Sequence, residues 1–334
     1  MILTLRALGV GDLATATPAL RALRTHHPDH EVTLAAPGWL APLVELIGGI
    51  DHHLHTPGLD PLTWTGPPPD IAVNLHGRGP QSHRMLATTR PRRLLAYTNP
   101  DAGHHDGPAW RDHDHEIDRW CHLLTWYDIP TDRTNLELRR PTPDGIPTGV
   151  SIVHPGAKAA QRRWPPARFA RVARELTGRG HRVVVTGSRA ERPIAAAVAR
   201  LAGLPDDAVL AGETDLGDLA ALVAYARLVV SGDTGIGHLA TAYRTPSVLL
   251  FGPVAPAQWG PPADRPWHQA LWAGPQARTA ADDAAPHPAL AALDVPQVLA
   301  AVDRVQRHRP ALLPHGRRIR PGEAVVNGPL ATGR

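Results

Sequence analysis

The chain has 334 residues, which is enough for about two domains of ordinary size. Hydrophobic residues make up 43% of the sequence and charged residues 20%, a balance that is typical of a globular protein and excludes a disordered chain. The single cysteine, Cys121, excludes a disulfide framework, and the small net charge of +4, with scattered arginines and few aromatic residues, argues against a nucleic-acid-binding protein.

The first half of the chain alternates between short apolar runs and amphipathic stretches. The runs are bounded by turn residues and predict strands at residues 2–6, 31–36, 70–75 and 93–97. Apolar residues at helical spacing predict helices through residues 13–23 and about 116–127. A proline-rich stretch poor in apolar residues follows and predicts a linker at residues 141–148.

The second half repeats this alternation more clearly. Strands are predicted at residues 150–153, 182–186, 208–210, 228–231 and 247–251. Helices are predicted at residues 167–176, from about 191, at 216–225 and at 295–305. We therefore expect an α/β protein with two Rossmann-like domains, residues 1–140 and 149–308, and a disordered tail at 309–334.

Ligands of open parallel sheets bind beyond the carboxyl ends of the strands, and the first loop of that kind is Gly9-Val-Gly11-Asp12-Leu-Ala14. Glycines there let the backbone approach a ligand, and the pattern formally matches a dinucleotide-binding turn. The second strand ends in Ala35-Ala36-Pro37, however, where that fold needs an acidic residue for the ribose. Asp12 as a simple helix cap is an equally good interpretation of the loop.

Three loops of the second half could also hold a ligand. The loop at residues 154–166 carries three cations that suit a diphosphate, although a solvated arginine loop is the simpler interpretation. Glu191 could accept sugar hydroxyls, but a carboxylate in a first helical turn is also ordinary compensation of the helix dipole. The loop at 231–238, with three glycines, Asp233 and His238, favours an anion site.

Histidine and carboxylate runs raise the question of a metal. Asp112-His-Asp-His-Glu116 and the pairs His52-His53 and His104-His105 look like ligand clusters. The chain has 20 histidines, so such runs arise readily by chance. We expect His115 and Glu116 to open a helix, and we expect no metal site.

Taken in order, these segments resemble glycosyltransferase family 9, the ADP-heptose:lipopolysaccharide heptosyltransferase family, over about residues 1–305. In the first half the matching motifs are Gly11-Asp12, Thr17-Pro-Ala-Leu20 and His115-Glu-Ile-Asp-Arg119. The second half matches more strongly, in His154-Pro-Gly, Arg163-Trp-Pro, Val185-Thr-Gly-Ser, Ser231-Gly-Asp-Thr-Gly, His238-Leu-Ala, Leu250-Phe-Gly-Pro and Trp259-Gly-Pro. Each motif alone is weak, but their joint order and spacing are specific.

The resemblance implies a GT-B fold, in which an N-terminal acceptor domain and a C-terminal donor domain face each other across a cleft. It also implies inverting glycosyl transfer without a metal, with Asp12 as the general base and Gly9 and Gly11 in the loop on the acceptor side. The donor diphosphate and sugar would contact the residues that match the donor site: Lys158, Arg162, Arg163, Glu191, Thr214, Asp233, Thr234, Gly235 and His238.

The implied partners are a nucleotide-sugar donor and a carbohydrate or glycoconjugate acceptor, with no cofactor and no nucleic acid. The expected reaction is the transfer of heptose from ADP-heptose. Leu8, Gly9 and Val10 stand where the family often has serines, which argues against an acceptor of the lipid A–Kdo type and leaves the identity of the acceptor open. Alternatives are transfer of another sugar, a sugar-nucleotide epimerase, and a non-catalytic nucleotide-sugar-binding protein. The sequence contains neither a signal-peptide pattern nor a membrane-spanning run, so we expect a cytoplasmic protein and leave open a peripheral contact with the inner membrane surface.

Overall fold

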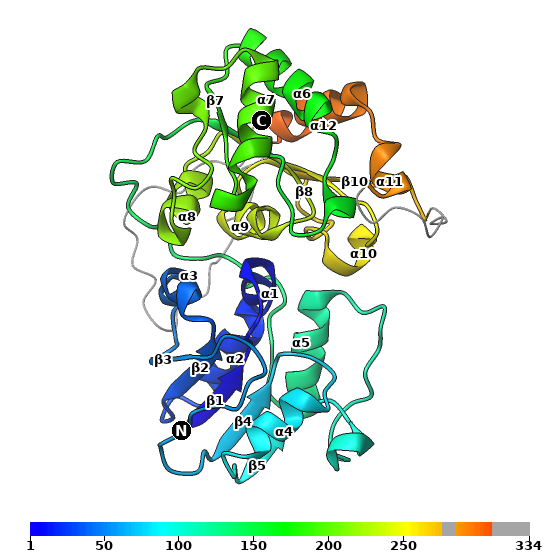
Figure 1. Cartoon of the computed structure of the whole chain (residues 1–334). Helices are drawn as coiled ribbons and strands as arrows, with labels where there is room; N and C mark the ends of the chain where they lie inside the picture. The colour runs from blue at the N-terminus through cyan, green and yellow to red at the C-terminus, as the bar shows by residue number, and fades with distance from the viewer. Residues whose placement is uncertain (276–284, 309–334) are drawn as a thin grey trace, which may run out of the picture.

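The computed structural model describes residues 1–275 and 285–308, which form two units stacked on each other (Figure 1). Each unit is built on one five-stranded parallel sheet, and residues 141–148 lie between the two sheets in the sequence. No helix of the described residues is both long enough and apolar enough to cross a bilayer. The predicted tail at 309–334 lies outside the described residues.

The first sheet has the strand order β3-β2-β1-β4-β5. Its central strands are buried along their whole length, as their continuous apolar runs predict. One face is covered by α4, and the other by the helices that flank β1 and β2 in the chain. The elements are β1 (Ile2–Leu5), α1 (Val10–Thr15), α2 (Thr17–His26), β2 (Val32–Ala36), η1 (Gly38–Leu40), α3 (Ala41–Ile47), β3 (His52–His55), β4 (Ile71–Asn74), α4 (Gln81–Ala87), β5 (Arg93–Leu95), η2 (Pro100–Ala102) and α5 (Glu116–Trp126).

The second sheet has the order β10-β9-β8-β6-β7. One face packs against α6, α7 and α12, and the opposite face packs against α8 and α9. The elements are β6 (Ser151–His154), η3 (Ala160–Arg162), α6 (Pro166–Gly178), β7 (Val183–Val185), η4 (Arg189–Glu191), α7 (Arg192–Ala202), η5 (Asp206–Ala208), α8 (Leu216–Ala224), β8 (Leu228–Gly232), α9 (Gly235–Tyr243), β9 (Ser247–Leu250), α10 (Pro256–Trp259), β10 (His268–Leu271), α11 (Pro288–Ala291) and α12 (Val295–Arg307).

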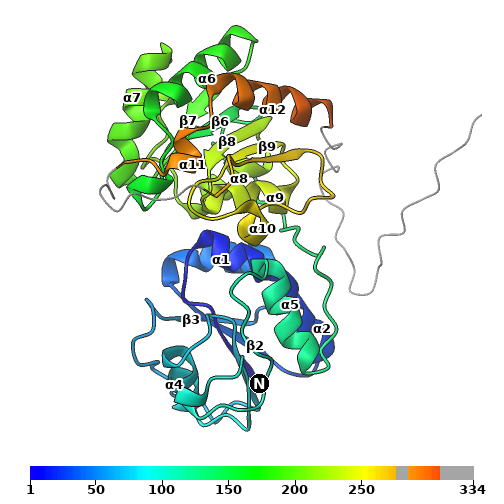
Figure 2. The ribbon, with the colours of Figure 1, turned by 90° about the vertical axis from the view of Figure 1, so that its right-hand side faces the viewer.

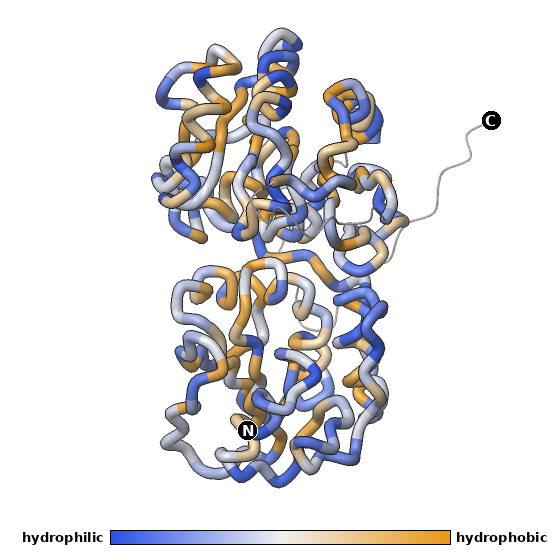
Figure 3. Tube along the Cα trace, turned by 45° about the vertical axis from the view of Figure 1, so that its right-hand side comes forward, coloured by the Kyte–Doolittle hydropathy of each residue, from blue (hydrophilic) through white to orange (hydrophobic). Residues whose placement is uncertain are grey.

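One apolar core runs through the contact between the two units. It joins buried residues of the first sheet and of α1 to buried residues of α8, α9 and the second sheet, among them Leu13, Leu222 and Leu239. Figure 2 shows α1 directly beneath α9 and α10, and Figure 3 shows apolar segments in the interior of both units. The face that joins the units is therefore packed like the interior of a single domain.

The structure departs from the sequence predictions at several elements. The predicted helix at 13–23 is divided at Ala16, because Pro18 has no N–H to continue the ladder of hydrogen bonds. The predicted strand at 208–210 is wrong, since only a single bridge joins Val209 to Val185 after η5. Strands β3 and β10 were not predicted, because each lies at a sheet edge and is rich in polar residues.

Candidate active site

Helices α1 and α9 meet where the carboxyl ends of β1 and β8 face each other (Figure 1). A Cβ atom added to Gly11 would lie 2.6 Å from Cδ2 of His238. A Cβ atom added to Gly235 would lie 2.8 Å from Cβ of Val10. Because real Cβ atoms do not come this close to their neighbours, the two glycines allow an approach that other residues would prevent.

Asp12 lies in the first turn of α1, on the side of the first unit that faces α9. Its Oδ2 accepts a hydrogen bond from the backbone N–H of Gly9 at 3.1 Å, so the predicted helix cap is present. Its Oδ1 lies 3.6 Å from Nη2 of Arg6, and 28% of the side chain is exposed. The carboxylate is thus held in place and still open to a ligand.

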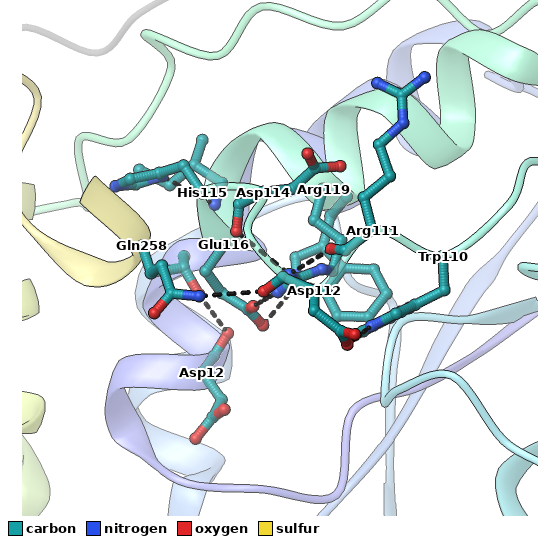
Figure 4. A network of polar contacts seen from close by, with 12 residues as sticks. Asp12, Trp110, Arg111, Asp112, Asp114, His115, Glu116, Arg119 and Gln258 are labelled. Carbon is teal, nitrogen blue, oxygen red and sulfur yellow. Dashed lines mark hydrogen bonds and ion pairs between the residues drawn. The ribbon is translucent and has the colours of Figure 1, made fainter. Parts of the chain in front are cut away.

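A buried charge network lies beside Asp12 (Figure 4). The guanidinium of Arg6, which is fully buried, donates from Nε to the backbone oxygen of Asp12 at 2.9 Å and from Nη2 to Glu116 at 2.7 Å. Glu116 also accepts from Arg119 and from the indole of Trp120. Burial raises the pKa of Glu116, but the charges of Arg6 and Arg119 outweigh this effect, and the pKa is lowered overall.

The amino end of α9 has the properties of an anion site. Its N-cap, Thr234, makes no side-chain capping bond, and its Oγ1 is buried without a hydrogen-bond partner among the described residues. Asp233 lies 3.3 Å from Nη1 of Arg162, which brings a cation to this end of the helix. The first-turn amides of α9 and this cation can bind a negatively charged group together.

Burial shifts the two titratable groups beside this helix end in opposite directions. It raises the pKa of Asp233, against the charges of His238 and Arg162. It lowers the pKa of His238, against the charges of Asp233 and Asp12. His238 is therefore neutral at physiological pH and lies between the carboxylates of the two units.

The remaining predicted donor residues are spread along the carboxyl edge of the second sheet. Lys158 is exposed on the loop after β6, and Arg163 turns back to donate to the backbone oxygen of Ala157 at 2.8 Å. Glu191 caps η4 through Ser188, and its carboxylate packs so closely on Gly156 that no Cβ would fit there. Thr214 is half-buried in the turn before α8. The contacts found for Arg163 and Glu191 are structural, and the donor roles of all four residues remain predictions.

Two contacts join the segment before α5 to α10 of the second unit. His115, the N-cap of α5 as predicted, lies 2.9 Å from the backbone oxygen of Gly260, and Gln258 donates to the backbone oxygen of Asp112 at 2.9 Å (Figure 4). The histidine and carboxylate run at 112–116 is thus used for capping and packing. No group of three or more His, Cys, Asp or Glu residues that could hold a metal ion occurs in the described part of the chain.

Several residues of this site were not predicted from the sequence. Arg6 and Glu116 are 110 positions apart, and their side chains form a hydrogen bond with each other. Gln258 stands in no predicted motif. The available signals are weak: Arg6 is a lone charge at the end of an apolar strand, and Glu116 belongs to the His115–Arg119 motif, which by itself indicates no role in the site.

Comparison with known proteins identifies the relatives of this chain. The model of glycosyltransferase family 9 (heptosyltransferase) matches residues 111–283. Lipooligosaccharide heptosyltransferase 2 of Haemophilus influenzae is 33% identical over 114 residues, 32% of each chain. Lipopolysaccharide heptosyltransferase 1 of Pseudomonas aeruginosa is 40% identical over 106 residues, 31% of this chain and 29% of that one. The alignments thus span only about a third of the length of these curated relatives.

Solved structures match over nearly the whole chain. The Escherichia coli ADP-heptose lipopolysaccharide heptosyltransferase II has a TM-score of 0.73 at 19% identity, with 92% of this chain and 98% of that one covered. A family 9 glycosyl transferase of Veillonella parvula has a TM-score of 0.77 at 20% identity, with 92% and 97% covered. The predicted GT-B fold with two Rossmann-like units is confirmed.

Proposed function

The chain belongs to glycosyltransferase family 9, and from that premise we propose that it transfers a heptose from ADP-heptose to a hydroxyl of a lipopolysaccharide-type acceptor. One observation carries the proposal. The contact between α1 and α9 brings the carboxylate of Asp12 and the anion site at Thr234 together, although they lie on different units.

The donor diphosphate fits the amino end of α9. Its negative charge would be met by the amides of Gly235 and Ile236 at the start of this nine-residue helix, by the Thr234 hydroxyl, which has no partner among the described residues, and by Arg162. These groups are fixed in place before the reaction, so they stabilise the charge that develops on the departing phosphate. We propose that this protein charge serves in place of a metal ion.

Asp12 is the proposed general base. It removes the proton from the acceptor hydroxyl, the freed oxygen forms a bond to the anomeric carbon, and the bond from that carbon to phosphate breaks and releases ADP. We propose that the attacking oxygen, held by Asp12 on α1, and the departing oxygen, held by the diphosphate site on α9, lie on opposite sides of the anomeric carbon. Transfer therefore inverts the anomeric configuration.

A transfer assay tests this proposal directly. The full chain is incubated, with and without EDTA, with heptose-free lipopolysaccharide and one of several donors: ADP-heptose, ADP-glucose, UDP-glucose or GDP-mannose. Mass spectrometry should detect a sugar adduct of the lipopolysaccharide with ADP-heptose and none with the other donors, and the yield should be the same with and without EDTA. NMR coupling constants should show an inverted linkage. A sugar adduct formed with another donor would contradict the proposal that heptose is the transferred sugar. Loss of transfer in EDTA that Mg²⁺ or Mn²⁺ restores would contradict the metal-independent step.

A further inference from the structure

His76 lies close to Asp12, and the proposed reaction gives this side chain no role. It follows β4, which pairs with β1, so its loop lies next to the loop that leads to Asp12. Its Nδ1 accepts a hydrogen bond from the backbone N–H of Ala7 at 3.2 Å. Its own backbone N–H donates to Oδ1 of the buried Asn74 at 3.1 Å, which fixes the turn.

These contacts determine which nitrogen of the imidazole carries the proton. Because Nδ1 accepts from Ala7, a neutral ring must be protonated at Nε2. Burial and the charge of Arg6 lower the pKa of His76 to about 4, against the opposing effect of Asp12, so the ring is neutral at physiological pH. Nε2 forms no hydrogen bond with the described residues, and it is not one of their fully buried polar atoms that lack a partner. This nitrogen is therefore accessible to a ligand.

We propose that His76 binds the acceptor, donating a hydrogen bond from Nε2 to an oxygen of the sugar next to the hydroxyl that Asp12 deprotonates. The inference rests on the proposed function and adds to it a residue that selects the acceptor. A neutral donor suits the hydroxyl and ring oxygens of a carbohydrate. It also leaves base catalysis to Asp12, because a ring that accepts at Nδ1 and is protonated at Nε2 has no nitrogen free to take a proton.

Two substitutions separate binding by His76 from support of its loop. In His76→Asn, the amide oxygen replaces Nδ1 and accepts from Ala7, but the outer donor is lost. In His76→Gln, the longer amide places an N–H donor near the former position of Nε2. We expect His76→Asn to lower kcat/KM for the acceptor by about five- to tenfold, the effect of one lost hydrogen bond, and His76→Gln to retain most of it.

The measurement uses the full chain, ADP-heptose and deacylated heptose-free lipopolysaccharide, with ADP affinity followed by calorimetry. The affinity for ADP should be unchanged in both variants, because the diphosphate is assigned to the other unit. Wild-type kinetics in His76→Asn, together with a loss in His76→Gln, would overturn the binding role and leave the proposed function standing. A wild-type protein that transfers no heptose would overturn the proposed function and this inference with it.

A second measurement does not depend on turnover. In the wild-type protein, ¹⁵N NMR of the ring of His76 should show the Nε2-protonated neutral form between about pH 5.5 and 8. Addition of the deacylated acceptor should shift the Nε2–H resonance. A ring protonated at Nδ1, or a resonance that the acceptor leaves unchanged, would contradict the proposal.

Discussion

The carboxylate of Asp12 has both a structural and a proposed chemical role. Oδ2 caps α1 through Gly9, while Oδ1 lies near Arg6 and the side chain as a whole is partly exposed. An amide at this position can still accept from Gly9 but cannot take a proton from a hydroxyl. Substitution by asparagine therefore separates the two roles.

Asp12→Asn should fold normally, bind ADP as the wild type does and lower kcat by about 10²-fold or more, as the loss of a general base does. Single-turnover transfer and calorimetry with ADP are the measurements. Asp101→Asn, which changes an exposed carboxylate on η2, is the matched control and should not affect either quantity. Turnover near the wild-type rate in Asp12→Asn would remove Asp12 from the role of base.

Arg162 is the cation that the structure brings to the amino end of α9. Its loss removes the charged hydrogen bond that we propose Arg162 makes to the diphosphate, so Arg162→Ala should raise the Kd of ADP by about ten- to a hundredfold. Arg171→Ala, at an exposed position of α6, is the matched control and should leave the Kd unchanged. Calorimetry with ADP measures the Kd of the wild type and of both variants. Equal affinity for ADP in the wild type and in Arg162→Ala would place the diphosphate elsewhere.

At the residue scale, the sequence predicts the groups that stand directly after apolar strands and glycine turns. Asp12 and the 233–238 loop are local patterns, and the structure brings them together. The network of Arg6, Glu116 and Arg119 could not be predicted in the same way. It depends on β1 and α5 packing together, which no local spacing specifies.

At the scale of elements, the buried strands and the edge strands β5 and β7 were predictable, whereas the polar edge strands β3 and β10 were not. Strands such as β8 are buried throughout, and their sequence is a continuous apolar run. Strand β3 reads His-His-Leu-His and is exposed at both ends, so its sequence carries no strand pattern. Such strands form because a neighbour offers backbone partners, as β2 does for β3 and β9 for β10.

The contact between α1 and α9 depends on the absence of a side chain at Gly235. Gly235→Ala would press a methyl group against Val10 and move the two helices apart, so transfer should fall by up to about 10²-fold while ADP still binds. The double variant Val10→Gly/Gly235→Ala should recover activity, because it removes the opposing Cβ. Gly178→Ala, where the added methyl meets open space, is the control. Full activity in Gly235→Ala would show that catalysis does not need this approach.

Strand β10 contains a buried histidine that makes stability depend on pH. Nδ1 of His268 is paired with Oγ of Ser247 at 2.8 Å, and burial, with lesser effects of Arg265 and Arg244, lowers its pKa to about 3. The unfolded chain takes up this proton near pH 6.5 and the folded chain does so only near pH 3. The contribution is therefore complete above pH 6.5 and is lost as the pH falls toward 3.

Between pH 7 and 5, this histidine should account for a loss of about 2 kcal/mol in the free energy of unfolding. Urea unfolding of wild type and His268→Asn at both values isolates the effect, because all other groups titrate in both proteins. The variant should be less stable at pH 7 but lose less stability on acidification. Equal losses in the two proteins would show that His268 does not titrate as its burial requires.

At the scale of the whole molecule, the sequence predicts two α/β units but not how they pack. The alternation of strands and helices and the proline-rich linker indicate the two units. The shared core across α1, α8 and α9 arises from apolar residues that would serve equally well inside either unit alone. The role of Gly11 and Gly235 in allowing the contact can be recognised only from the relative positions of α1 and α9.

We propose that the donor binds to the second unit with its reactive carbon facing Asp12 of the first. A crystal structure of the full chain with ADP-2-deoxy-2-fluoro-heptose would show where the donor binds and how it is oriented. We predict a diphosphate within hydrogen-bond distance of the amides of Gly235 and Ile236 and of the guanidinium of Arg162, with the anomeric carbon on the side of Asp12. A diphosphate bound away from α9, or an anomeric carbon turned away from Asp12, would contradict the account.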